Sequence, residues 1–203
     1  MSSPPGQEVP SPAVDSVCPR GRGFRGEGRF QALKIILLGL GAAVGYGILQ
    51  DNVTARIAPS YFNVAHPDLG YPAIFHHASP TVLAFAWGVV ATWWVGFPLG
   101  ILMALCARAG GWPKLEARAL LKPVGKLLGV MIVGAFLGGL LAWGLGISYY
   151  APAGIPLDQK EGWGIDFGAH LAAYFVGPAG GLVLCVLTLL RRRRLSRSLG
   201  DPA

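Results

Sequence analysis

The chain has 203 residues, of which 53% are hydrophobic and 13% charged, and its net charge is +7. Soluble domains carry about 25% charged residues, so this chain has too little polar surface to cover a water-soluble globule. The basic residues flank apolar runs instead of interleaving with aromatic residues. This pattern favours a membrane protein and argues against a nucleic-acid-binding surface.

Residues 1–30 are rich in Pro, Gly, Ser and Arg and contain almost no apolar run. Such a segment buries too little surface to offset the entropy lost on ordering, so we predict a disordered, basic cytoplasmic tail. The apolar run that follows starts late and lacks a clean small-residue cleavage site. We therefore interpret it as a retained first span and not as a signal peptide.

Four apolar runs define a membrane domain over residues 31–194, followed by a short cytoplasmic tail at 195–203. Each run approaches or exceeds the ~20 residues that cross the hydrocarbon core, and we place the spans at about 32–50, 81–107, 124–149 and 167–190. Pro98 is expected to kink the second span, and the stretch 177–181 (GPAGG) to break the fourth. The basic and apolar connector 108–126 predicts a short amphipathic helix at the membrane surface.

Small residues recur at four-residue spacing on two of these spans: Gly39, Ala43 and Gly47 on the first, and Gly134, Gly138, Ala142 and Gly146 on the third. Such faces allow helices to approach closely. We therefore place the third span at the centre of the bundle. The same faces are candidate contacts for a second copy of the chain or for another membrane protein.

Charge asymmetry predicts the orientation of the bundle. Of the 17 Lys and Arg residues, only Arg56 and Lys160 lie in the loops on one side of the four predicted spans. The positive-inside rule then places both termini in the cytoplasm. The sequence thus predicts an all-α polytopic membrane protein. We expect a four-helix transmembrane bundle of N-in/C-in topology, integral to the bacterial inner (plasma) membrane, with the lipid bilayer as its first partner.

The longest polar stretch between apolar runs covers residues 46–80 and holds three of the four histidines. In the predicted topology every histidine lies outside or at the outer end of a span. Asp166 and His170 are four residues apart at the start of the fourth span, so they share one helix face. Asp51, at the outer end of the first span, is positioned to meet them.

These observations define a candidate polar cluster made of Asp51, Asn52, Arg56, His66, Asp166 and His170. Asp166 and His170 are possible ligands of a divalent metal such as zinc, or an acid/base pair. Alternatively, Asp166 favours the positive end of its helix dipole while His170 bonds within the bundle. Because no HExxH or similar compact motif is present, the structural interpretation without a cofactor is favoured. Asp51 and Arg56 are costly near the bilayer edge unless paired, so an ion pair or network is expected.

A resemblance follows from the segment after the first span, which reads Tyr46-Gly47, Asp51-Asn52-Val53-Thr54-Ala55-Arg56, Tyr61-Phe62 and His66-Pro67. It resembles a family of uncharacterised bacterial four-span membrane proteins that carry YG, DQ-x-T, YF-T and often HP in this order. The chain departs from that pattern at Asn52, where Gln is common, at Gln50, where His often precedes the Asp, and at Asn63, where Thr usually follows YF. The resemblance implies a four-helix membrane protein and directs attention to this first outward segment.

Three functions are compatible with these features. We favour a non-enzymatic membrane protein that packs or interacts through its glycine-rich helices and its outward polar segment. The first alternative is a membrane-embedded enzyme or metal-binding protein that acts at the outer leaflet through the Asp/His cluster. The second is a small transporter component, although the spans hold few polar residues to line an ion path. The sequence leaves open whether the protein is an enzyme.

Overall fold

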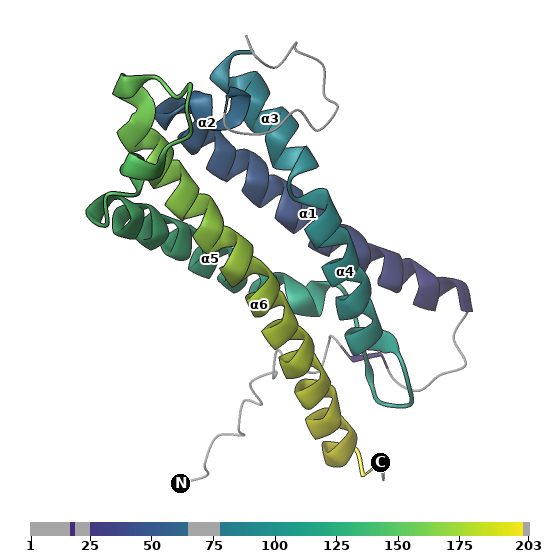
Figure 1. The fold of residues 1–203 in the computed structure, drawn as a ribbon. Coiled ribbons are helices and arrows are strands. Elements are labelled where there is room, and N and C mark those ends of the chain that lie inside the picture. Colours follow the sequence, from purple (N-terminus) through teal and green to yellow (C-terminus); the bar gives the residue numbers. More distant parts are fainter. Residues whose placement is uncertain (1–16, 19–24, 65–77, 201–203) are drawn as a thin grey trace, which may run out of the picture.

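The computed structural model describes residues 17–18, 25–64 and 78–200. Four helical segments are long and apolar enough to cross a membrane: Glu27–Ile57, Pro80–Arg108, Arg118–Gly144 and Leu157–Ser198. They form an antiparallel bundle in which successive segments run in opposite directions (Figure 1). The predicted all-α, four-helix membrane fold is therefore confirmed.

The elements follow one another in a simple order. Helix α1 (Arg25–Ile57) is followed by the short α2 (Ser60–Asn63), and α3 (Pro80–Val90) with α4 (Trp93–Arg108) makes the second membrane segment. Strand β2 (Lys114–Leu115) precedes α5 (Arg118–Gly144), and the 3-10 turns η2 (Ile147–Tyr150) and η3 (Leu157–Gln159) lead to α6 (Lys160–Ser198). Strand β1 (Val17–Cys18) pairs antiparallel with β2.

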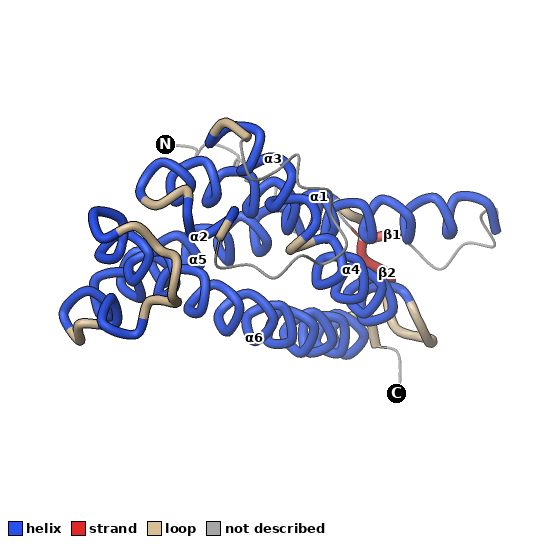
Figure 2. The backbone as a smooth tube through the Cα atoms, turned by 45° about the horizontal axis from the view of Figure 1, so that its top comes forward, coloured by secondary structure: helices blue, strands red, loops and turns tan. Residues whose placement is uncertain are grey.

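Two closely packed helix pairs build the bundle. Helix α1 lies along α3 and α4, and α5 lies along α6, while the two pairs meet mainly through α4 and α6. Helices α1 and α5 touch only slightly, and the views in Figures 1 and 2 show the separation of the pairs. The predicted central position of the third span is wrong, because α5 exposes large side chains such as Val133 and Phe136. Helix α6 packs against both pairs instead.

Glycines permit both close helix pairs. A Cβ atom on Gly88 would lie 2.5 Å from the backbone nitrogen of Ile48, and one on Gly100 would lie 2.7 Å from the carbonyl oxygen of Ile36. In the second pair, a Cβ atom on Gly168 would overlap the helix α5 backbone. The helices thus meet backbone to backbone, which only residues without a side chain allow.

Helix breaks differ from the sequence-based expectation. Helix α6 continues through 177–181 with Pro178 inside it, so the predicted break there is wrong. A proline removes one hydrogen bond, here to the carbonyl four residues earlier, and the small neighbouring residues leave room for its ring. The second membrane segment is instead interrupted at Ala91 and Thr92, ahead of Pro98. The Thr92 hydroxyl bonds back to the Gly88 carbonyl at this junction.

Several boundaries also differ. Helix α1 begins at Arg25, within the predicted N-terminal tail, and continues past residue 50 because the polar stretch 51–56 keeps helical backbone bonds. Glu27 in its first turn favours the positive end of the helix dipole. Helix α6 likewise runs to Ser198, inside the predicted C-terminal tail. The separate amphipathic helix expected in 108–126 is absent, since a strand and a turn lead directly into α5 at Arg118.

Candidate functional site

The candidate site lies where α1 ends, α2 packs and α6 begins, which we call the α2 end of the bundle. Asp51 is carried by α1, and Asp166 and His170 by α6. A cluster of buried apolar residues surrounds this end: Ala55, Ala58, Tyr61, Phe62, Leu83, Ile155 and Trp163. The bundle therefore places these polar side chains in a largely water-free environment.

His170 joins the two transmembrane helix pairs through its contact with Asp51. Its Nε2 lies 3.0 Å from Asp51 Oδ1, and its Nδ1 lies 2.7 Å from the backbone oxygen of Asp166. A carbonyl oxygen only accepts, so Nδ1 carries a hydrogen. One further hydrogen fills the contact between Nε2 and Oδ1, either on the ring or on the carboxyl. The Asp51–His170 pair therefore shares one proton and is neutral overall in both arrangements.

Aromatic side chains from α2 hold the imidazole in place. The Tyr61 ring stacks on His170 with centroids 4.7 Å apart and planes 25° apart, and Phe62 meets the same ring edge-on at 5.7 Å. Burial, followed by smaller contributions from Tyr174, Asp166 and Asp51, raises the pKa of the Tyr61 hydroxyl. This hydroxyl therefore stays protonated throughout the physiological pH range.

Asp166 is the most deeply buried acid of the described residues, with 0% exposure. Neither carboxyl oxygen has a hydrogen-bond partner in the described part of the chain. The backbone N–H of Ala58 lies beside this carboxyl but donates to the Thr54 carbonyl at 3.0 Å. Ser60 Oγ and Trp163 Nε1 at the same end are also buried without a partner among those residues. Such groups are costly unless they are satisfied, so this end has unused hydrogen-bonding capacity.

Asn52 and Arg56 lie on the exposed side of the same helical turn. The Arg56 guanidinium donates to the backbone oxygen of Asn52, to its Oδ1 at 3.1 Å and to Thr81 Oγ1 at 3.0 Å. This network ties α1 to the first turn of α3. Arg56 thus pairs with neutral groups, whereas Asp51 contacts His170. His66 lies outside the described residues.

The predicted metal ligands, Asp166 and His170, belong to no larger group of ligands in the described residues. His170 contacts Asp166 through the backbone carbonyl and not through the carboxyl. Within residues 17–18, 25–64 and 78–200, no group of three or more His, Cys, Asp and Glu side chains is arranged to hold a metal ion. The geometry of this site is that of a hydrogen-bonded acid–histidine pair.

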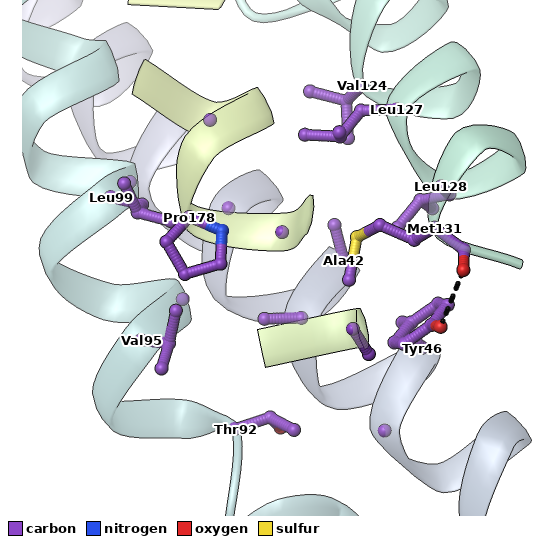
Figure 3. Close-up of a pocket in the computed structure, with 18 of the residues that line it drawn as sticks. Ala42, Tyr46, Thr92, Val95, Leu99, Val124, Leu127, Leu128, Met131 and Pro178 are labelled. Atoms are coloured by element: carbon purple, nitrogen blue, oxygen red, sulfur yellow. Dashed lines mark hydrogen bonds between the residues drawn. The ribbon is translucent and has the colours of Figure 1, made fainter. Parts of the chain in front are cut away.

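A cavity of about 130 Å³ extends from this pair into the space between the helix pairs. Figure 3 shows Val95 and Leu99 facing it from one side and Leu127 and Met131 from the other. Its lining on α1 extends from Ile35 to Asp51, a distance of about 24 Å at 1.5 Å per residue. The cavity is therefore long and narrow.

Polar side chains line only one half of the cavity, the half nearest the α2 end. They are Tyr46, Gln50, Asp51, Thr92, His170 and Tyr174. The remaining lining is aliphatic side chains, methionines, glycines and one proline. The cavity thus has one polar end and one apolar end, as a molecule with a polar head and an apolar chain does.

Sequence reasoning missed four polar lining residues of the site, Tyr46, Gln50, Thr92 and Tyr174. Helical spacing offered a signal for one of them, because Tyr174 follows His170 by four residues and so shares its face. Tyr46 belongs to the segment that carries the resemblance, but no role was assigned to it. Gln50 is the neighbour of Asp51 in sequence and was likewise given no role. No pattern indicated that these residues border a cavity.

No known protein family, curated protein or solved structure matches this chain. Fold and composition define its class, a four-helix integral membrane protein.

Proposed function

We propose that this protein is a non-enzymatic binding protein of the bacterial inner membrane that holds one single-chain amphiphile in its central cavity. Its α2 end faces outward and both termini lie in the cytoplasm, as the charge asymmetry favours. The chain of the ligand lies among the aliphatic side chains, and its head lies beside Asp51 and His170. The resemblance to four-span bacterial membrane proteins is compatible with this placement.

The observation that carries this proposal is the one-ended polarity of the cavity. A path for ions or polar solutes needs polar groups along its length, and this cavity has them in one half only. Binding sites for small molecules are mostly apolar, with a few polar groups that fix orientation. The surrounding bilayer supplies amphiphiles at high local concentration, and the cavity lining extends along about 24 Å of α1.

The proposed partners of the helix faces are lipids and, as a prediction, a second copy of the chain. Most small residues named above are used within the chain, where they seat α1 on α3 and α4, and α5 on α6. Gly41 and Gly45 differ, because a Cβ atom on either would meet nothing within 4 Å. A homo-oligomer would therefore use this open face of α1.

Photolabelling in proteoliposomes tests the proposal. A photoreactive single-chain lipid is expected to label residues on the cavity wall in a saturable way, because one site is available. Val95→Phe places a ring in the cavity and should reduce saturable labelling at least tenfold. The matched Val133→Phe variant changes a side chain that is 57% exposed on α5 and should label as wild type. Labelling that never saturates, or that is equal in both variants, contradicts the proposal.

A second candidate function is acid/base chemistry on the bound molecule at the outer leaflet. The observation that favours it is the contact of 3.0 Å between Asp51 Oδ1 and Nε2 of His170, whose ring is oriented by the Asp166 carbonyl. An oriented histidine next to a carboxyl is the usual arrangement of a general base. Mass spectrometry of the bound lipid before and after incubation tests this candidate. Turnover requires a mass change in wild type that His170→Asn abolishes.

A further inference from the structure

The three hydroxyl groups that line the cavity already donate hydrogen bonds within the protein. Each donates to a backbone carbonyl: Tyr46 to Met131 at 3.1 Å, Tyr174 to Ala91 at 3.4 Å, and Thr92 to Gly88. A hydroxyl oxygen that has donated its hydrogen still has lone pairs that accept. These three side chains therefore present acceptors, and not donors, to a molecule in the cavity.

The other polar side chains of the cavity lining are His170, Asp51 and Gln50. Both ring nitrogens of His170 are engaged, one by Asp51 and one by the Asp166 backbone oxygen. Gln50 is one of the residues that line the cavity, and its Oε1 is buried and has no hydrogen-bond partner among the described residues. A buried acceptor without a donor costs about 1–3 kcal/mol. Within the cavity lining, the oxygens of these side chains can still accept, and a ligand with a donor satisfies them.

Charge at this end disfavours an anionic head. The Asp51–His170 pair is neutral overall and so offers no net positive charge. The cation nearest in sequence to Asp51, Arg56, is exposed and bonded to Asn52 and Thr81. A carboxylate or phosphate head would therefore lose its hydration without gaining a positive partner.

From these contacts we infer that the amphiphile is an uncharged single-chain lipid whose head donates a hydrogen bond, such as a long-chain alcohol or a monoacylglycerol. This inference rests on the proposed function and specifies its ligand class. The hydroxyl donates to Gln50 Oε1 in the acceptor-lined half of the cavity. The hydrocarbon chain extends towards Leu99 and Leu127.

Competition against the photolabel by lipids of one chain length tests the inference. The competitors are hexadecanol, its methyl ether and palmitate, added to wild-type protein in proteoliposomes at pH 7.5. Hexadecanol should displace the label best. The ether, which lacks the donor, should be at least fivefold weaker, and palmitate, which is anionic, at least tenfold weaker.

Gln50→Leu supplies the matched variant because it removes the acceptor and keeps a side chain of similar size. It should weaken the displacement of the label by hexadecanol about fivefold and leave the displacement by the ether unchanged. A folding defect would weaken both. Equal displacement by all three competitors, or a preference for palmitate, overturns the inference and leaves the binding function standing. Absence of saturable labelling in wild type overturns the binding function itself.

Discussion

Arg192 is a buried cation whose partners are backbone carbonyls. It is 1% exposed and donates to four carbonyl oxygens at the end of α4 and in the following connector: Cys106 at 2.6 Å, Ala109 at 2.7 Å, Pro113 at 2.8 Å and Trp112 at 3.0 Å. The last carbonyls of a helix carry partial negative charge and lack partners within the helix. Arg192 therefore satisfies the end of α4 and attaches it to α6.

Replacing this side chain should be costly. Arg192→Met leaves those carbonyls without donors and is expected to lower the free energy of unfolding by about 3 kcal/mol or more, since hydrogen bonds to charged groups contribute about 1.5–3 kcal/mol each. Unfolding in mixed micelles with increasing SDS measures the change. Arg194→Met is the control, because Arg194 is exposed on the same helix and should shift stability by about 0.5 kcal/mol or less. If both substitutions lower the free energy of unfolding equally, the structural role of Arg192 is contradicted.

Tyr61 gives the site a dependence on alkaline pH. Burial raises its pKa in the folded protein above the ordinary value of about 10. A group with a raised folded pKa contributes stability that is complete below its unfolded pKa and is lost as the pH rises above it. Wild type should therefore lose stability between pH 10 and 11 more steeply than Tyr61→Phe. Thermal melts of both proteins across this pH range check the slope, and parallel curves contradict the burial of this hydroxyl.

At the scale of the elements, glycine positions determine which helices touch. Gly88→Leu forces a side chain into the backbone of α1 at Ile48, whereas Gly41→Leu points into open space. Overpacking of this kind costs about 1–3 kcal/mol, so the Gly88 variant should unfold at lower SDS than the Gly41 variant. If both variants behave alike, the close packing of α1 on α3 is wrong.

The membrane-spanning elements were predictable because apolar length is a local property of the sequence. Their ends were less predictable. The first span was placed at about 32–50, yet its helix continues through the polar residues 51–56, where Arg56 bonds to Asn52 across one turn. Pro178 also misled, because a proline weakens a helix without always breaking it. The small-residue ribbon on α5 predicted close packing but not the identity of its neighbour, which no repeat spacing encodes.

The site was predictable only in its local part. The four-residue spacing of Asp166 and His170 placed both on one face, and the structure adds that the ring bonds to the Asp166 backbone and not to its carboxyl. The bond from His170 to Asp51 joins residues 119 positions apart in sequence. Such a pairing depends on how the two transmembrane helix pairs dock. Apolar periodicity leaves that docking undetermined.

At the scale of the whole molecule, the basic residues and the polar half of the cavity are distributed along the same direction, from one end of the bundle to the other. In the described chain, Arg56 and Lys160 are the basic residues at the α2 end, and the others lie towards the opposite end. The proposed orientation predicts that a membrane-impermeant maleimide added to intact cells labels Asp158→Cys and not Arg194→Cys. Both positions are exposed at opposite ends of α6 and its preceding turn. The reverse labelling would invert the topology and place the acid–histidine pair in the cytoplasmic half.

The cavity between the transmembrane helix pairs is the feature on which the functional account depends. Tight pairs that meet mainly through α4 and α6 leave a long space whose polar groups gather beside Asp51 and His170. A bundle that served only as a packing partner would gain dispersion energy by filling that space. The proposed lipid chain would provide the missing contacts.

Native mass spectrometry of the protein released directly from membrane nanodiscs tests this account most directly. We predict one adduct per chain in wild type, with the mass of an uncharged single-chain lipid. It should be absent from Val95→Phe and retained in Val133→Phe. A wild-type chain that carries no adduct, or adducts of equal number in both variants, would contradict the account and return the cavity to an unoccupied gap between helices.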